Sequence, residues 1–257
     1  MLLYSSTWMI PWIVFGGGVG LIAAWAGRVL TRILPASRSW YEGAEFSEAE
    51  PAPPGYHWKG EEQMPPAGVP VLWWVRRGRP LDRRGELGLD IGLILSGIII
   101  AAWHGPGVIG FAGLMVGLLC YLIARMDHDH NWIPDFIVIP LTLAGLLASP
   151  FDLGDYSRIV GLSMAMATIW VVFALYGRTK GIEVMAGGDV ILAGAGGAWL
   201  GAQGAPAFLV LSVALFVTHV LILHIRSGQT WKSVGSRWNA MGPAMCLALV
   251  LLTLFTP

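Results

Sequence analysis

The sequence predicts an all-α membrane protein that crosses the bilayer about eight times. Of its 257 residues, 55% are hydrophobic and only 12% are charged, whereas soluble domains carry about 25% charged residues. The mean hydropathy is +0.64. The chain also contains thirteen Trp residues, a residue type that collects at membrane–water interfaces. A soluble domain of this composition would expose large apolar patches and aggregate.

Eight apolar stretches account for the predicted spans. They lie near residues 8–28, 88–104, 107–125, 135–151, 159–177, 189–203, 205–225 and 240–256. About 20 residues are needed to cross a bilayer, so we expect the short second, fourth and sixth stretches to be tilted or shielded by their neighbours. The first stretch lacks a basic n-region and is too long for a cleaved signal peptide.

The basic residues predict the orientation of these spans. If the N-terminus lies outside, fifteen of the sixteen Lys and Arg residues fall in internal loops, and only Arg158 lies outside. This distribution follows the positive-inside rule. It predicts a multi-pass inner-membrane protein, with an external N-terminus and large internal loops.

Composition also excludes two classes of protein. Sixteen basic and sixteen acidic residues leave no net charge, so nucleic acid is not an expected partner. The two cysteines, Cys120 and Cys246, each lie inside an apolar stretch and are expected to be small buried hydrophobes rather than a disulfide framework. Glycines within the spans, such as Gly113, Gly117 and Gly197, predict close packing of helix backbones.

The stretches divide the chain into three parts, which are a first transmembrane helix (1–30), a cytoplasmic loop (31–87) and a seven-helix membrane core (88–257). Residues 40–63 of the loop contain six Glu and one Lys. This composition predicts a solvated linker, or alternatively an acidic surface that attracts a basic partner segment. Residues 69–79 are aromatic and amphipathic and are expected to lie at the membrane interface.

Ionisable residues near a membrane are informative because an unpartnered charge there is costly. Two clusters stand out, residues 126–135 with Asp127 and residues 185–189 with Asp189. The predicted orientation places both clusters at the internal face. Asp127 and Asp189 are therefore expected to meet at one depth.

Two carboxyl groups in contact share a proton, which suits them to activate water for peptide hydrolysis. Asp189 begins a predicted span, where the helix dipole favours its anion, while Asp127 follows the end of one. We therefore expect Asp189 to be the base and Asp127 to carry the proton. Gly187 and Gly188 leave room for a substrate backbone to approach.

Both clusters resemble motifs of a known family, the type IV prepilin peptidases, which are membrane aspartic proteases of the GxGD class. The first motif is Asp127-x-Asp129-His130-x-x-Ile133-Pro134-Asp135, followed by IPLTLAGL at 139–146. The second is Gly187-Gly188-Asp189-Val190, continuing to GAWLG at 197–201. Met241-Gly242-Pro243 is similar to the family's Phe-Gly-Pro, and 69–79 is similar to the stretch before its zinc-binding cysteines.

The resemblance implies an endopeptidase that cleaves the basic leader of a type IV prepilin or pseudopilin at the cytoplasmic face of the membrane. Asp127 and Asp189 would be its catalytic pair, and membrane lipid would surround it. Asp135 would not be a catalytic acid, and we expect it to cap the fourth span. Proteolysis by this pair is expected to need no metal and no cofactor.

Two positions and one loop depart from the family pattern. Ala186 stands where GxGD begins with Gly, and Ile191 stands where a Lys is usual. The loop contains no cysteine and so cannot form a four-cysteine zinc site. The family's second activity, methylation of the new N-terminal amine with S-adenosylmethionine, is associated with that loop. The sequence does not decide whether this chain has that activity.

Two alternatives remain at this point. Ala186 and Ile191 suit a catalytically weakened relative that binds prepilins or an assembly partner without cleaving them. Alternatively, Asp127, His128, Asp129 and His130 offer oxygen and nitrogen ligands for a metal-binding or ion-coupled transporter. Alternating residues of one short segment rarely converge on a single ion, so the transporter is the weaker of the two.

Overall fold

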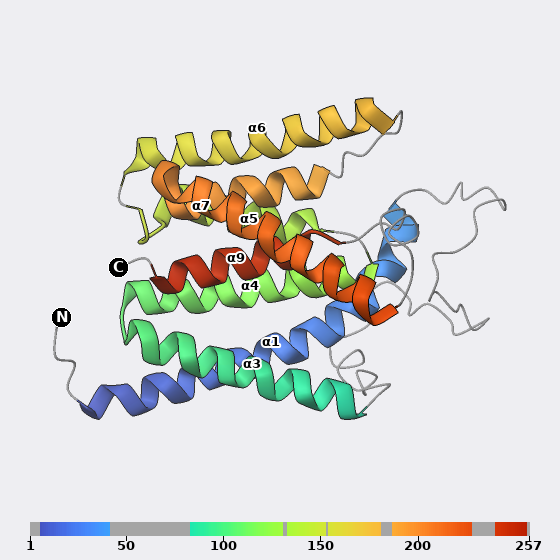
Figure 1. Cartoon of the computed structure of the whole chain (residues 1–257). Coiled ribbons are helices and arrows are strands. Elements are labelled where there is room, and N and C mark those ends of the chain that lie inside the picture. The colour runs from blue at the N-terminus through green and yellow to red at the C-terminus, as the bar shows by residue number, and fades with distance from the viewer. Residues whose placement is uncertain are drawn as a thin grey trace.

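The computed structural model describes residues 6–41, 83–130, 133–152, 154–180, 187–227 and 240–255, and within these ranges it is all helical, with no strand (Figure 1). The helices are α1 (Ser6–Tyr41), α3 (Arg83–His104), α4 (Val108–His130), α5 (Asp135–Ala148), α6 (Asp155–Lys180), α7 (Gly187–Ser227) and α9 (Gly242–Phe255). The predicted all-α class is confirmed.

Four of these helices are long and apolar enough to cross a membrane, and α3, α5 and α9 contribute shorter apolar segments. Helix α7 is interrupted at Gly201, where the backbone has φ 66°. Figure 1 shows the parts before and after this residue running in opposite directions. Helix α7 therefore supplies two of the predicted spans, and the described residues account for all eight.

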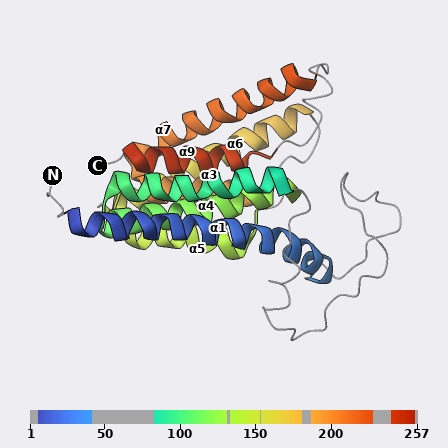
Figure 2. The same ribbon diagram turned by 90° about the horizontal axis from the view of Figure 1, so that it is seen from below.

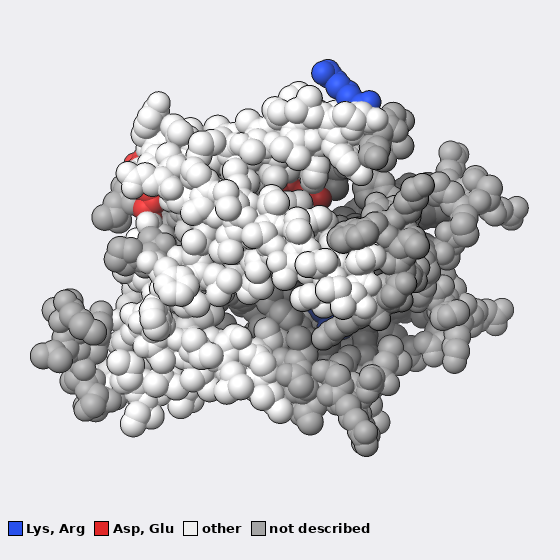
Figure 3. Space-filling model, in the orientation of Figure 1, with Lys and Arg blue, Asp and Glu red and all other residues white. Residues whose placement is uncertain are grey.

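Helices α4 and α9 occupy the middle of the bundle, with α1 and α3 on one side and α6 and α7 on the other (Figures 1 and 2). Side chains from four helices fill the interior around them. The most deeply buried include Ile123, Val138, Leu192, Phe208 and Met245. The face seen in Figure 3 carries few charged residues, and many large hydrophobic side chains are exposed, as expected where lipid rather than water surrounds a membrane bundle.

Glycine sets how closely the helices approach one another. In α6 and α7, Gly161 and Gly197 face each other so closely that a Cβ on either would collide with the backbone of the other helix. Gly113 likewise packs against His104 and Ile100, leaving no more than van der Waals space for a Cβ. These contacts confirm the packing role predicted for the glycines at 113 and 197.

Two helix boundaries differ from the predicted ones. Helix α1 extends to Tyr41, well past the predicted end at 28, and α3 begins at Arg83 rather than 88. The apolar residues of 29–34 continue at helical spacing beyond the membrane span, so nothing stops α1 at the lipid boundary. Residues 42–82, which hold most of the acidic segment and all of the 69–79 segment, lie outside the described residues.

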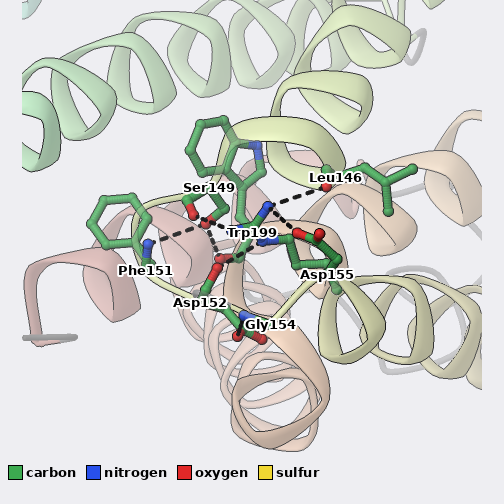
Figure 4. A network of polar contacts seen from close by, with 8 residues as sticks. Leu146, Ser149, Phe151, Asp152, Gly154, Asp155 and Trp199 are labelled. Carbon is green, nitrogen blue, oxygen red and sulfur yellow. Dashed lines mark hydrogen bonds and ion pairs between the residues drawn. The ribbon is translucent and has the colours of Figure 1, made fainter.

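Helix α1 begins and helix α9 ends at one end of the bundle, and the helix ends that carry Asp127 and Asp189 lie at the other (Figure 1). At the former end, the side chain of Arg158 is buried and organises the α5–α6 connection, of which Ser149, Asp152 and Gly154 are seen in Figure 4. Its guanidinium donates hydrogen bonds to the carbonyl oxygens of Asp152 at 2.7 Å and Ser149 at 2.9 Å. Arg158, which the predicted orientation places outside, therefore has a structural role.

The same connection holds the turn in α7. Ser149 Oγ donates a 2.6 Å hydrogen bond to the carbonyl oxygen of Trp199, and the amide of Ala202 donates to Ser157 Oγ at 3.0 Å. Backbone groups freed by the break at Gly201 are therefore satisfied by side chains, as buried polar groups require.

Candidate active site

Asp127 lies in the last turn of α4 and is buried, with 6% of its surface exposed. Its Oδ2 accepts a 2.8 Å hydrogen bond from the amide of Gly242, the first residue of α9. This bond joins positions 115 residues apart. It fixes one oxygen of the carboxyl group against the N-terminus of a neighbouring helix.

Asp189 lies in the first turn of α7 and is partly buried. Its Oδ1 is inaccessible to solvent and accepts no hydrogen bond from any described residue. The negative charge of Asp127 acts on the carboxyl group of Asp189. The fold thus places the two carboxyl groups that the sequence analysis singled out within electrostatic range of each other.

Apolar side chains surround the two carboxyl groups. Met126 precedes Asp127 and is fully buried, while Ile133, Leu192 and Met245 belong to the same buried core from three other segments. Such surroundings exclude water from most of the site and strengthen the electrostatic interaction between the carboxyl groups.

The two glycines before Asp189 are not equivalent. A Cβ at Gly187 would meet nothing within 4 Å, whereas a Cβ at Gly188 would lie 2.8 Å from Cβ of Ile133. Gly187 is also exposed. Among the described residues, open space therefore lies beside Gly187 while Gly188 is packed against Ile133, and the approach of a substrate at these glycines stays a prediction.

The later parts of the two motifs contact each other and hold α5 against α7. Trp199 donates a 2.8 Å hydrogen bond from Nε1 to the carbonyl oxygen of Leu141. A Cβ at Gly145 would lie 2.6 Å from the indole ring of Trp199. This contact positions the N-terminal half of α7, on which Asp189 is carried.

The predicted cap by Asp135 is wrong. Helix α5 begins at Asp135 with Pro134 as its N-cap, and no side chain makes a capping hydrogen bond. The carbonyl oxygen of Pro134 accepts the first helical bonds, from the amides of Ile137 and Val138 at 3.0 Å. Because the extended Pro134 takes the cap position, the helix starts one residue earlier than a cap at Asp135 would require, and the side chain of Asp135 is exposed.

The cluster that could hold a metal is only partly described. Asp127 is buried and His128 is exposed, while the side chains of Asp129 and His130 lie outside the described residues. Within the described part of the chain, no three His, Cys, Asp or Glu side chains gather.

The positions that depart from the family pattern have different settings. Ile191 is partly buried and packs against the core, and Ala186 lies outside the described residues.

Both cysteines are buried and unbridged, Cys120 in α4 and Cys246 in α9. Their side chains contact each other, a proximity that the sequence analysis did not foresee.

Sequence reasoning also missed the amide of Gly242 as a partner of Asp127. The only signal was the likeness of Met241-Gly242-Pro243 to the family's Phe-Gly-Pro. That likeness marks the position without saying what it contacts.

Comparison with known proteins identifies the family. The sequence profile of the Type IV leader peptidase family matches residues 114–223, which contain both carboxyl groups. A prepilin leader peptidase/N-methyltransferase of Dickeya chrysanthemi is 27% identical over 97% of this chain and 95% of its own length. The protein of the same name from Pseudomonas aeruginosa is 32% identical over 74% of this chain and 67% of its own.

The chain belongs to the type IV leader peptidase family. The family and the fold make it a multi-pass membrane peptidase, as the two motifs predicted. No solved structure matches the chain.

Proposed function

We propose that this leader peptidase cleaves the basic leader from prepilin or pseudopilin precursors at the cytoplasmic face of a bacterial inner membrane, with Asp127 and Asp189 activating water. The observation that carries the proposal is that these two carboxyl groups are withdrawn from solvent and interact electrostatically at one end of an apolar bundle. A relative that matches 97% of the chain is named a prepilin leader peptidase/N-methyltransferase.

Two carboxyl groups that interact in an apolar site hold one proton between them. The ionised group takes a proton from water, and the protonated group donates its proton to the scissile carbonyl oxygen. The exposed edge at Gly187 is where the substrate backbone would approach Asp189. Proteolysis by this route needs no metal.

The orientation belongs to the same proposal. An external N-terminus places fifteen of sixteen basic residues inside, and the buried setting of Arg158 explains the exception. The catalytic pair then faces the cytoplasm, because it lies at the end of the bundle opposite the start of α1. The acidic segment at 40–63 would attract a basic leader by charge.

Methylation is a separate question. The residues do not fit the family's zinc site, because the two cysteines of the chain are both buried in membrane helices. A methyl transfer by this chain therefore cannot use that zinc site. Transfer of a methyl group from S-adenosylmethionine would add one methyl mass to the product, which distinguishes it from cleavage.

A second candidate is a weakened relative that binds prepilins without cleaving them. The residue that favours it is Ile191, two residues after Asp189. The family pattern has a lysine at this position, whereas the side chain of Ile191 packs against the core. Changing Ala186→Gly and Ile191→Lys together restores the family pattern. A large gain of cleavage in that variant would support the weakened relative, and no gain would count against it.

The experiment is to incubate the purified full chain in lipid vesicles with a prepilin from the same genome and to weigh the product. The proposal predicts loss of the leader and a product that begins with the mature residue. Binding of the prepilin without any loss of mass would contradict it in favour of the second candidate.

A further inference from the structure

We infer that the N-terminus of α9 holds Asp127 as the ionised member of the pair, so that Asp127 is the general base and Asp189 carries the proton. This inference rests on the proposed function and assigns roles within it. It reverses the roles expected from the sequence, because that reasoning considered only the helix on which each carboxyl group lies.

The first observation is the hydrogen bond between Asp127 and α9. The amide of Gly242 has no acceptor within its own helix, since the first amides of any helix lack one. It donates instead to Oδ2 of Asp127 at 2.8 Å. An amide bonded to a carboxylate favours the charged form, and the dipole of α9 adds to the effect.

The second observation is the contrast at Asp189. Its Oδ1 is buried and accepts no hydrogen bond from a described residue. Asp189 also lies at a helix N-terminus, whereas Asp127 lies between the C-terminus of α4 and the N-terminus of α9, so the helix dipoles alone do not favour a negative charge on Asp127. The hydrogen bond from the amide of Gly242 favours Asp127, because Oδ2 of Asp127 accepts it whereas Oδ1 of Asp189 accepts none from a described residue.

The other ionisable groups around Asp127 agree with this assignment. On α4, His128 follows it and interacts with it electrostatically, which favours a negative charge on Asp127. On α9, Cys246 faces it as a thiol. On α7, Asp189 lies within electrostatic range, and the negative charge of Asp127 acts on its carboxyl group. A proton on Asp189 removes the repulsion between the two.

The geometry also explains why residue 242 is glycine. A Cβ at this position would lie 2.6 Å from Oδ2 of Asp127 and 3.2 Å from its Cβ. A larger residue would push the carboxylate away from the amide that holds it. Gly242 is therefore a positioning residue, acting on the reaction through Asp127.

The resulting chemistry balances. Asp127 takes a proton from water as the water oxygen bonds to the scissile carbonyl carbon, and Asp189 gives its proton to the carbonyl oxygen. The gem-diol then collapses, the C–N bond breaks, Asp127 gives its proton to the departing amine and Asp189 recovers one from the diol hydroxyl. The pair returns to its starting state with one water consumed.

Infrared spectroscopy of the full chain with isotope-labelled aspartate tests the assignment directly, because a protonated carboxyl group has its own C=O stretch. At neutral pH we expect this band to disappear in Asp189→Asn and to persist in Asp127→Asn. Disappearance in Asp127→Asn with persistence in Asp189→Asn would overturn the assignment.

Activity gives an independent test through Gly242→Ala, with Gly92→Ala as control because a Cβ at Gly92 meets nothing within 4 Å. We expect Gly242→Ala to lower kcat about 100-fold, the scale of a misplaced catalytic group, and to move the acidic limb of the pH–rate profile to higher pH. A lower kcat with an unmoved profile would reduce Gly242 to a structural role and overturn the inference.

Different results contradict the proposed function and the assignment of roles to the two carboxyl groups. If neither aspartate variant loses cleavage, the proposed function fails and the roles fail with it. If both variants lose cleavage but the infrared band belongs to Asp127, only the assignment of roles fails.

Discussion

Ile133 packs directly against Gly188, so that a Cβ on this glycine would lie 2.8 Å from Cβ of Ile133. The contact joins the segment after α4 to the start of α7, and each of these helices carries one carboxyl group of the proposed pair. Gly187, one residue earlier, has no such neighbour. The two adjacent glycines therefore differ in their surroundings, with Gly188 packed and Gly187 open.

Gly187→Ala tests the approach of the substrate. The variant should fold with unchanged thermal stability, because its Cβ enters open space. We expect kcat/KM to fall at least tenfold if the substrate backbone passes over this position. The measurement is the rate of leader removal beside the thermal unfolding midpoint. Unchanged kcat/KM would show that the substrate approaches elsewhere.

Gly188→Ala makes the matched comparison. Here the added methyl group must displace Ile133 from a packed core, which costs about 1–3 kcal/mol. A lower unfolding midpoint is therefore expected together with lower activity. Equal stability of the two alanine variants would contradict the difference in packing.

Arg158→Ala should destabilise the bundle without touching the reaction. The substitution leaves buried carbonyl oxygens of the α5–α6 connection without a donor, and we expect a loss of about 3 kcal/mol. Asp155→Asn removes only the ion pair with Arg158, in which the side chain of Asp155 is 90% exposed, so it should cost less than about 1 kcal/mol. Thermal unfolding in detergent ranks the two, and equal losses would refute this account of Arg158.

Gly201→Ala should also lower stability while sparing catalysis per folded molecule. Gly201 has φ 66°, where a side chain costs roughly 1–2 kcal/mol, and its Cβ would collide with the carboxyl group of Asp152. The site lies at the opposite end of the bundle. A normal unfolding midpoint in this variant would mean that the turn in α7 tolerates other backbone geometry.

Much of this architecture is readable from the sequence. The lengths of the apolar stretches and the positions of the basic residues predicted eight spans. They also placed Asp127 and Asp189 at one end of the bundle, because successive spans leave their connecting loops on alternate sides of the membrane. The two-part nature of α7 was also predicted, since 189–225 is too long for a single span and contains Gly201.

Other features depend on contacts between distant segments. The partner of Asp127 is an amide 115 residues away, and an amide has no side chain to mark it in a sequence. Asp135 satisfied the rule for a helix cap, yet the extended Pro134 took that position. The burial of Arg158 follows from carbonyl oxygens that only the folded connection exposes to it.

The central claim is that Asp127 and Asp189 together hydrolyse the leader peptide bond. The most direct measurement is the rate of leader removal, by mass spectrometry, for Asp127→Asn, Asp189→Asn and the control Asp135→Asn, whose side chain is exposed in the first turn of α5. We expect each of the first two variants to lose at least about 100-fold in rate and the control to match the unmodified protein. Leader removal at the normal rate by either Asp127→Asn or Asp189→Asn would contradict the account.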